Sequence, residues 1–259
     1  MLAVIGTAFS TASAGLVLSL DGSRTGDEGE VGGDRYLTAP AMSDATAVLQ
    51  AAGFTIGTTS AFTAANIVGA CSLYTGAVDV AFTAQEIADV QAFVNAGGGL
   101  VIQHDWNSYY PAADALAAAF GATYNAGPFG PPVIGSPVNM TMAHPIWNGP
   151  AGSVTTYDQV YSGSVSGVTG IGDHSTDPSQ VALAVTTYGA GRVVFLTDMD
   201  AWDSLPDAVS PIPGSNNAIV WENIFQYTCG GPVIPAPGAI LLGTLGTALV
   251  TWLRRRRTL

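Results

Sequence analysis

This 259-residue chain contains no lysine. All nineteen acidic residues precede the arginine cluster at residues 254–257. Only three arginines precede it, namely Arg24, Arg35 and Arg192. The formal net charge is −12 for the whole chain, so without the four clustered arginines it is −16. A surface of this charge repels nucleic acid phosphates and anionic lipid headgroups, which excludes both as partners of the body of the protein.

Cysteine is also rare, because only Cys71 and Cys229 occur. No C-x-x-C pair or Cys/His cluster is present, which excludes the common structural zinc sites. In an oxidising compartment the two thiols can pair, but the sequence does not show whether their Cα atoms lie within bridging distance. A disulfide and two buried free thiols therefore stand as alternative predictions.

Long apolar runs are scarce, and the two that we consider lie near the ends of the sequence. Residues 1–14 are apolar and small, and Ala12-Ser13-Ala14 has the A-x-A form of a signal-peptidase site. A basic n-region is missing, so the true start lies upstream or the first residues are truncated; a buried first strand is the alternative. Residues 238–253 are shorter than the ~20 residues of a stable transmembrane helix, which favours a transient membrane helix.

The C-terminal tail combines three parts in a fixed order. Pro235-Ala236-Pro237 precedes the apolar run, and Arg254-Arg255-Arg256-Arg257 follows it. This order resembles the PEP-CTERM sorting signal, although that family usually has Glu where this chain has Ala236. The resemblance implies export, processing by an exosortase, and membrane contact through the tail helix only, with the arginines on the cytoplasmic side. An exopolysaccharide of the matrix is then a candidate partner. An ordinary tail anchor remains the alternative.

Between the two ends, strand and helix patterns alternate. Thr83-Ala84-Gln85-Glu86 is a capping box that begins a helix, and Gly97-Gly98-Gly99 ends that helix. Further helices are predicted at residues 43–52, 112–120 and 216–228. Strands are predicted at residues 16–20, 54–56, within 70–80, and at 100–102, 154–165, 168–172, 181–187 and 192–197. Residues 127–152 are rich in Pro and Gly and are interpreted as a surface excursion. We therefore expect one domain at residues 15–229, followed by a linker at 230–237 and the sorting tail at 238–259.

This alternation predicts an α/β fold with a mostly parallel sheet flanked by helices, to which a later hairpin adds antiparallel strands. The order resembles the flavodoxin-like, class I glutamine amidotransferase-like fold, in its secreted uncharacterised and trehalose-utilisation-like groups. The segments that carry this resemblance are residues 82–102, 144–146 and 188–194. The resemblance covers most of residues 16–229.

Polar residues that follow the predicted strands are the candidate site, because ligands of open parallel sheets bind beyond the carboxyl ends of the strands. His104, Asp105 and Asp198 are the catalytic candidates, since imidazole and carboxylate groups transfer protons. The other candidates for a ligand cleft are Asp21, Trp106, Asn107, His144 and Asp200. Clustered carboxylates also suit Ca²⁺, while capping of turns is the alternative role, and no other cofactor is expected.

Amidotransferases of this fold use a cysteine nucleophile at a sharp strand-to-helix turn. The corresponding turn here is His104-Asp105-Trp106, which has no cysteine, so thiolate chemistry is not expected. Two hypotheses follow: an exported, non-catalytic domain, or a secreted hydrolase or carbohydrate-active enzyme that uses a His/Asp cleft. Convergence of His104, Asp105 and Asp198 on one open pocket would favour the enzyme.

Overall fold

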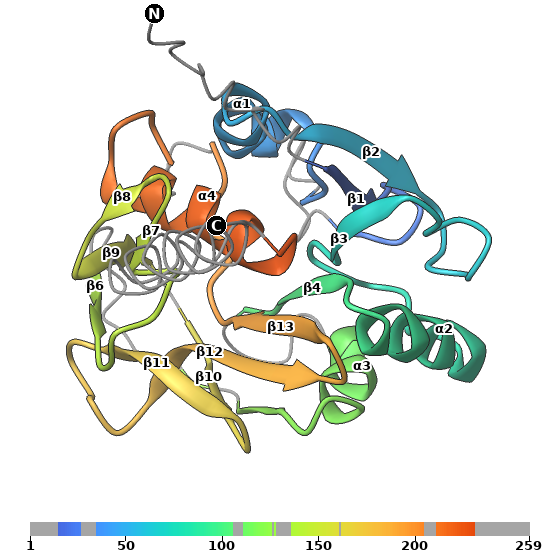
Figure 1. Ribbon diagram of the computed structural model, residues 1–259. Coiled ribbons are helices and arrows are strands. Elements are labelled where there is room, and N and C mark those ends of the chain that lie inside the picture. The colour runs from blue at the N-terminus through green and yellow to red at the C-terminus, as the bar shows by residue number, and fades with distance from the viewer. Residues whose placement is uncertain are drawn as a thin grey trace, which may run out of the picture.

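The computed structural model describes residues 15–26, 35–105, 111–125, 127, 136–160, 162–204 and 211–230. These residues build one nine-stranded sheet (Figure 1). In spatial order its strands are β2 (Thr55–Thr59), β1 (Leu16–Leu20), β3 (Ala70–Tyr74), β4 (Gly99–Gln103), β13 (Gly191–Leu196), β12 (Val181–Tyr188), β11 (Thr169–His174), β6 (Ser136–Met140) and β9 (Thr156–Gln159). The first five strands run parallel, and each later strand is antiparallel to its neighbour. The predicted fold class is therefore confirmed.

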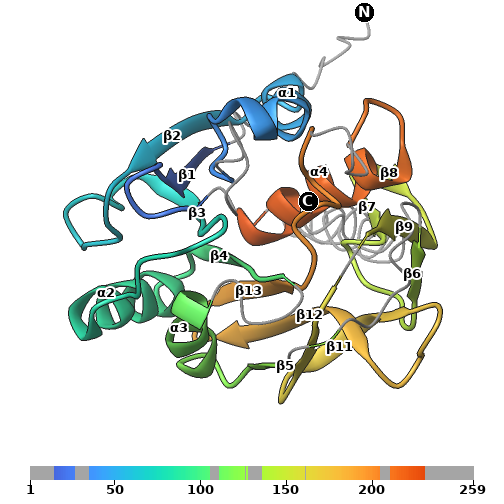
Figure 2. The same ribbon diagram turned by 180° about the vertical axis from the view of Figure 1, so that it is seen from behind.

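Helices cover both faces of this sheet, as Figures 1 and 2 show from opposite sides. The helices on one face are α1 (Ser43–Ala51) and α4 (Asn216–Thr228), and those on the other are α2 (Ala84–Asn95) and α3 (Asp114–Ala118). Short 3-10 turns, η1 (Pro40–Met42) and η3 (Pro111–Ala113), precede α1 and α3, so the helix predicted at 112–120 is shorter than expected. Among the described residues, no helix has the length and apolarity that a membrane span needs.

The buried strands feed two separate hydrophobic cores because successive side chains of a strand point to opposite faces. In β4, Leu100 and Ile102 join the core beneath α2 and α3, while Val101 joins the core beneath α1 and α4. Both faces of β4 are therefore apolar, and its sequence is a continuous apolar run. This is the pattern of a parallel strand that is covered on both sides.

The capping box at the start of α2 is confirmed. The Thr83 hydroxyl accepts a hydrogen bond from the Glu86 N–H at 3.2 Å, and the Glu86 carboxylate accepts one from the Thr83 N–H at 2.9 Å. Arg24 also donates to Glu86, at 2.6 Å. Burial opposes ionisation of this carboxyl, but the bonds from Arg24 and Thr83 outweigh burial and lower the pKa of Glu86. The first turn of α2 thus contains the Glu86 carboxylate, which also binds Arg24 of the loop after β1.

Two expectations about strands are wrong. Residues 154–165 are not one strand, because β9 belongs to the large sheet whereas β10 (Ser164–Ser166) pairs with β5 (Thr123–Asn125). Residues 127–152 are not only a surface excursion, since β6 lies within the large sheet, between β11 and β9. The hairpin β7 (Asn148–Gly149) and β8 (Gly152–Ser153) follows it. These strands are two to five residues long, too short for a distinct period-two pattern.

A disulfide joins β3 to the end of α4. The Cα atoms of Cys71 and Cys229 lie 4.8 Å apart, and 158 positions separate the two residues in the sequence. Beside them, the Ser72 hydroxyl donates a hydrogen bond to the Thr228 hydroxyl at 2.9 Å. The alternative of two free thiols is therefore wrong. The predicted signal peptide and the tail from residue 231 onward lie outside the described residues.

Candidate functional site

The carboxyl ends of β1, β4 and β13 carry four of the predicted polar residues, as expected for a parallel sheet. Asp21 follows β1, the pair His104-Asp105 follows β4, and Asp198 follows β13 by two residues. Asp21 is half-buried and caps its own turn, because its carboxylate accepts bonds from the N–H and hydroxyl of Ser23. Trp106 and Asn107, predicted for the same edge, lie outside the described residues.

His104 is held by acceptors at both ring nitrogens. Its Nδ1 lies 2.8 Å from the Asp105 carbonyl, and its Nε2 lies 3.2 Å from a carboxylate oxygen of Asp114. The ring also stacks on Tyr124 at 4.3 Å between centroids. Burial lowers the pKa of His104 and outweighs the two acceptors, which favour the charged form. An acceptor lies beside each ring nitrogen and the residue is only 5% exposed, so little of the ring is open to a substrate.

Asp198 acts as a cap at the end of β13. One carboxylate oxygen accepts the N–H of Val160 at 2.7 Å, and the other accepts the N–H of Asp200 at 2.9 Å. Burial raises the pKa of Asp198, and the nearby Asp200 adds to this effect. Asp105 and Asp198 are each 2% exposed, so the three catalytic candidates do not converge on an open pocket in the described part of the chain. The capping role that the sequence left open describes Asp198.

A buried arginine completes this edge of the sheet and was not predicted from the sequence. The Nε of Arg35 lies 2.8 Å from a carboxylate oxygen of Asp203, and its Nη2 lies 3.7 Å from one of Asp200. Arg35 is 2% exposed and Asp203 is fully buried. Burial raises the pKa of the neighbouring Tyr74, against the effect of Arg35. Asp200, predicted as a cleft residue, is therefore part of a buried ion-pair cluster.

Ser162 and His174 form a second buried polar pair that sequence analysis missed. His174 ends β11 and is fully buried. The Ser162 hydroxyl lies 3.5 Å from the His174 Nε2, which resembles a nucleophile beside its base. The same Nε2 lies 2.9 Å from the Gly163 carbonyl, an acceptor only, so it carries the ring proton. That tautomer cannot accept the hydroxyl proton at Nε2, so the pair is structural.

His144 lies in the loop between β6 and β7 and not at the end of a parallel strand. Its Nδ1 accepts the N–H of Ile146 at 3.2 Å, and its ring contacts Tyr227 of α4 at 4.6 Å between centroids. Burial and the nearby Arg192 lower the pKa of His144 to about 4. The residue thus shapes the loop, and the structure does not bring it to the carboxyl edge of the sheet.

We predict that the protein loses stability in mild acid because of its three histidines. Burial lowers the pKa of His104, His144 and His174, so the folded state binds fewer protons than the unfolded state, whose histidines titrate near ~6.5. The contribution of these residues to the free energy of unfolding is fully present above pH ~6.5 and declines as the pH falls toward their folded-state pKa values. We expect NMR titration of the imidazole nitrogens to show His144 titrating near pH 4. A folded-state midpoint at or above ~6.5 for any of the three would contradict this.

No arrangement for a metal ion is present among the residues that the structure describes. No group of three or more His, Cys, Asp or Glu side chains there is placed to hold one. Of the three aspartates that follow β13, Asp200 and Asp203 instead lie beside Arg35, and Asp198 accepts hydrogen bonds from two backbone N–H groups. The carboxylates that follow β13 therefore contact Arg35 or the backbone.

No protein-family model matches the sequence, and no protein of curated function matches it either. Solved structures do. The mmIFT52 N-terminal domain has 14% identity and a TM-score of 0.65, over 84% of this chain and 99% of that one. The cytoplasmic protein STM1381 from Salmonella typhimurium LT2 has 13% identity and a TM-score of 0.58, over 82% and 98%.

A thua-like protein from Parabacteroides merdae has 11% identity and a TM-score of 0.52, over 85% of this chain and 91% of that one. Likenesses at this level of identity concern the fold alone. They confirm the resemblance to the trehalose-utilisation-like, class I amidotransferase-like fold. Activity has to be argued from the residues of this chain.

Proposed function

We propose that the protein is an exported cell-surface or extracellular-matrix protein, sorted by an exosortase, with a non-catalytic amidotransferase-like domain. One observation carries the proposal for the domain: the catalytic candidates His104, Asp105 and Asp198 are buried, and the contacts of His104 and Asp198 lie within the fold. His104 faces the Asp105 carbonyl and Asp114, and Asp198 caps two backbone N–H groups. A catalytic acid or base needs an accessible atom that can exchange a proton with a substrate, and the contacts of these groups leave few such atoms.

The two cysteines support the lack of amidotransferase chemistry. That reaction in this fold needs a thiolate, and Cys71 and Cys229 are bound to each other in a disulfide. The turn after β4 supplies His104 and Asp105 in place of a cysteine. Imidazole and carboxylate groups transfer protons, but they do not form the thioester intermediate.

The same disulfide supports export. Disulfides persist in oxidising compartments and are rare in proteins of the cytosol. The tail motif Pro235-Ala236-Pro237, the apolar run and Arg254–Arg257 support sorting by an exosortase, and residues 1–14 support passage through the export machinery. The large negative charge of the body suits an aqueous extracellular setting.

The sorting part of the proposal is tested by mass spectrometry of the surface form, from cells that carry an exosortase. We expect a C-terminus near Pro235–Pro237 and loss of Arg254–Arg257. A variant in which the four arginines are replaced with alanine serves as the control and should not be processed. An intact tail on the mature surface protein would overturn exosortase sorting.

The non-catalytic part is tested on the purified protein by its release of ammonia from glutamine. We expect none above the level of a Cys71→Ala, Cys229→Ala variant, because neither sulfur is a free thiolate. Release that vanishes in this variant would overturn the proposal. A screen with ester and glycoside substrates, with His104→Gln as the matched variant, tests the hydrolase alternative. Turnover that depends on His104 would favour that enzyme.

A further inference from the structure

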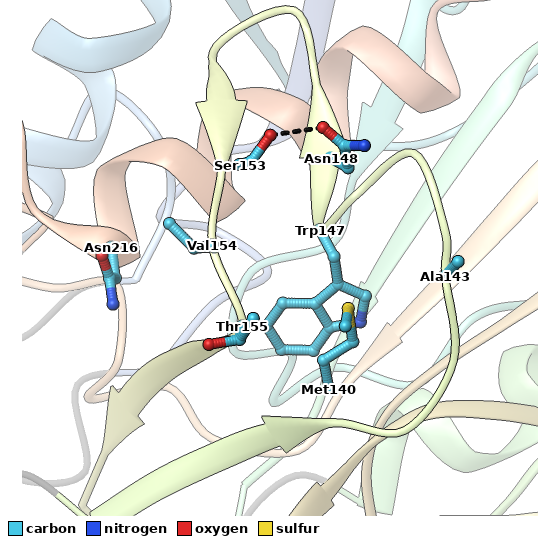
Figure 3. A pocket seen from close by; sticks show the side chains of 8 residues that line it. All are labelled: Met140, Ala143, Trp147, Asn148, Ser153, Val154, Thr155 and Asn216. Carbon is cyan, nitrogen blue, oxygen red and sulfur yellow. Dashed lines mark hydrogen bonds between the residues drawn. The ribbon is translucent and has the colours of Figure 1, made fainter.

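A hollow of about 450 Å³ lies on the antiparallel side of the domain, and Figure 3 shows the side chains that line it. Its walls come from the end of β6, the β7–β8 hairpin, the segment leading into β9 and the first residue of α4. The residues used below are Met140, Trp147, Asn148, Ser153, Thr155 and Asn216. The volume falls at the small end of the ~300–1,000 Å³ typical of ligand pockets. A hollow of this size suits the end of a polymeric ligand or a short branch of one.

The floor and the hairpin are held rigidly. Trp147 is fully buried, and its indole N–H donates to the Ile171 carbonyl at 2.7 Å. From α4, the buried Asn223 accepts the N–H of Ala151 at 3.0 Å and donates to the carbonyls of Ile146 and Gly152. The hollow is therefore formed before any ligand binds, which reduces the ordering cost of binding.

The lining combines neutral polar groups with apolar surface and contains no charged side chain. Asn148 and Asn216 present amides, and Ser153 and Thr155 present hydroxyls, all on exposed residues. Each of these groups supplies both a donor and an acceptor, as the hydroxyls of a sugar do. Met140, 37% exposed at the rim, adds a flexible apolar surface against which C–H groups pack.

The same lining disfavours other ligand classes. An ion would lose hydration in the hollow without gaining an opposite charge, and the acidic body repels anionic ligands from a distance. A purely aliphatic ligand would remove water from the amides and hydroxyls without replacing their hydrogen bonds. A neutral ligand rich in hydroxyl groups satisfies both kinds of surface.

We propose that this hollow binds a short segment of a neutral glycan. The inference rests on the proposed function, since it gives the exported, non-catalytic domain its ligand. Ser153 donates to Asn148, so the Asn148 amide is oriented with its nitrogen available to the ligand. Thr155, from the segment leading into β9, and Asn216, from the start of α4, contact the ligand together with the apolar surface of Met140.

The test is an array of neutral and uronate-containing oligosaccharides probed with the full-length protein, followed by titration calorimetry on the neutral oligosaccharides that bind. The Thr155→Val, Asn216→Ala double variant should weaken binding by about tenfold, since two hydrogen bonds to the ligand are lost. Thr55→Val, on the exposed edge strand β2, is the matched control and should bind as the unchanged protein does. The Trp147 indole N–H resonance should shift on binding.

Three results would overturn the inference: no binding of neutral oligosaccharides at millimolar concentration, stronger binding of uronate-containing ones, or equal binding by the double variant. Circular dichroism of the double variant checks that it is folded, and an Ala143→Trp variant, which fills the hollow from its rim, gives an independent measurement. If the protein is processed and inactive but binds no neutral glycan, the inference fails and the proposed function stands. If it turns over a substrate, the proposed function fails whatever the array shows.

Discussion

Replacing Arg35 with methionine is expected to lower the free energy of unfolding by about 3–5 kcal/mol. Arg35 is 2% exposed and lies 2.8 Å from the fully buried Asp203 and 3.7 Å from Asp200. Methionine keeps most of the apolar stem but removes the guanidinium. The Asp203 carboxylate is then left in a buried site without its cation, and that desolvated charge is the source of the loss.

Urea unfolding of the full-length protein measures this effect, with two matched variants. The Arg35→Met, Asp203→Asn double variant should recover part of the lost stability, because the fully buried carboxylate is gone and only the partly exposed Asp200 has lost its cation. Arg192→Met removes a partly buried arginine that donates to the Tyr227 carbonyl and lies over its ring at 4.8 Å. It should cost only about 1–2 kcal/mol. Equal losses for the two single variants would show that the buried ion pair has no special weight.

Removal of the disulfide is the second large effect, with an expected loss of about 2–5 kcal/mol in the Cys71→Ala, Cys229→Ala variant. The bond joins residues that are 158 positions apart, and so it restricts most of the unfolded domain. It also fixes the end of α4 to β3, next to the point where the chain leaves the described domain.

Thermal and urea unfolding with and without reductant test this prediction. Reductant should lower the stability of the unchanged protein to that of the double alanine variant and should leave the variant unaffected. The neighbouring pair Ser72–Thr228 provides a non-covalent control between the same two elements. Its Ser72→Ala, Thr228→Ala variant should lose about 0.5–1.5 kcal/mol. A disulfide variant no less stable than this control would contradict the expected covalent contribution.

The sequence alone predicted those elements whose determinants are local. The capping box Thr83–Glu86, the helix at 216–228 and the strand at 16–20 occur where expected, because hydrogen bonds and apolar periodicity act over a few residues. The order of these elements also predicted the parallel half of the sheet, since alternating strands and helices have few ways to bury their apolar faces. The net charge and the rarity of cysteine also led us to expect no nucleic acid partner and no common zinc site, and both stay predictions.

Only the tertiary structure decided what the polar residues do. His104 and Asp198 follow the predicted strands, yet their partners Asp114 and Val160 come from other segments of the chain. The pairing of Arg35 with Asp203 and the closeness of Cys71 to Cys229 join residues more than 150 positions apart. Burial and charge pairing depend on how elements that are distant in the sequence pack together, and local sequence patterns do not predict that packing. The hollow above Trp147 arises in the same way, from an irregular segment that acquires its shape by packing against α4.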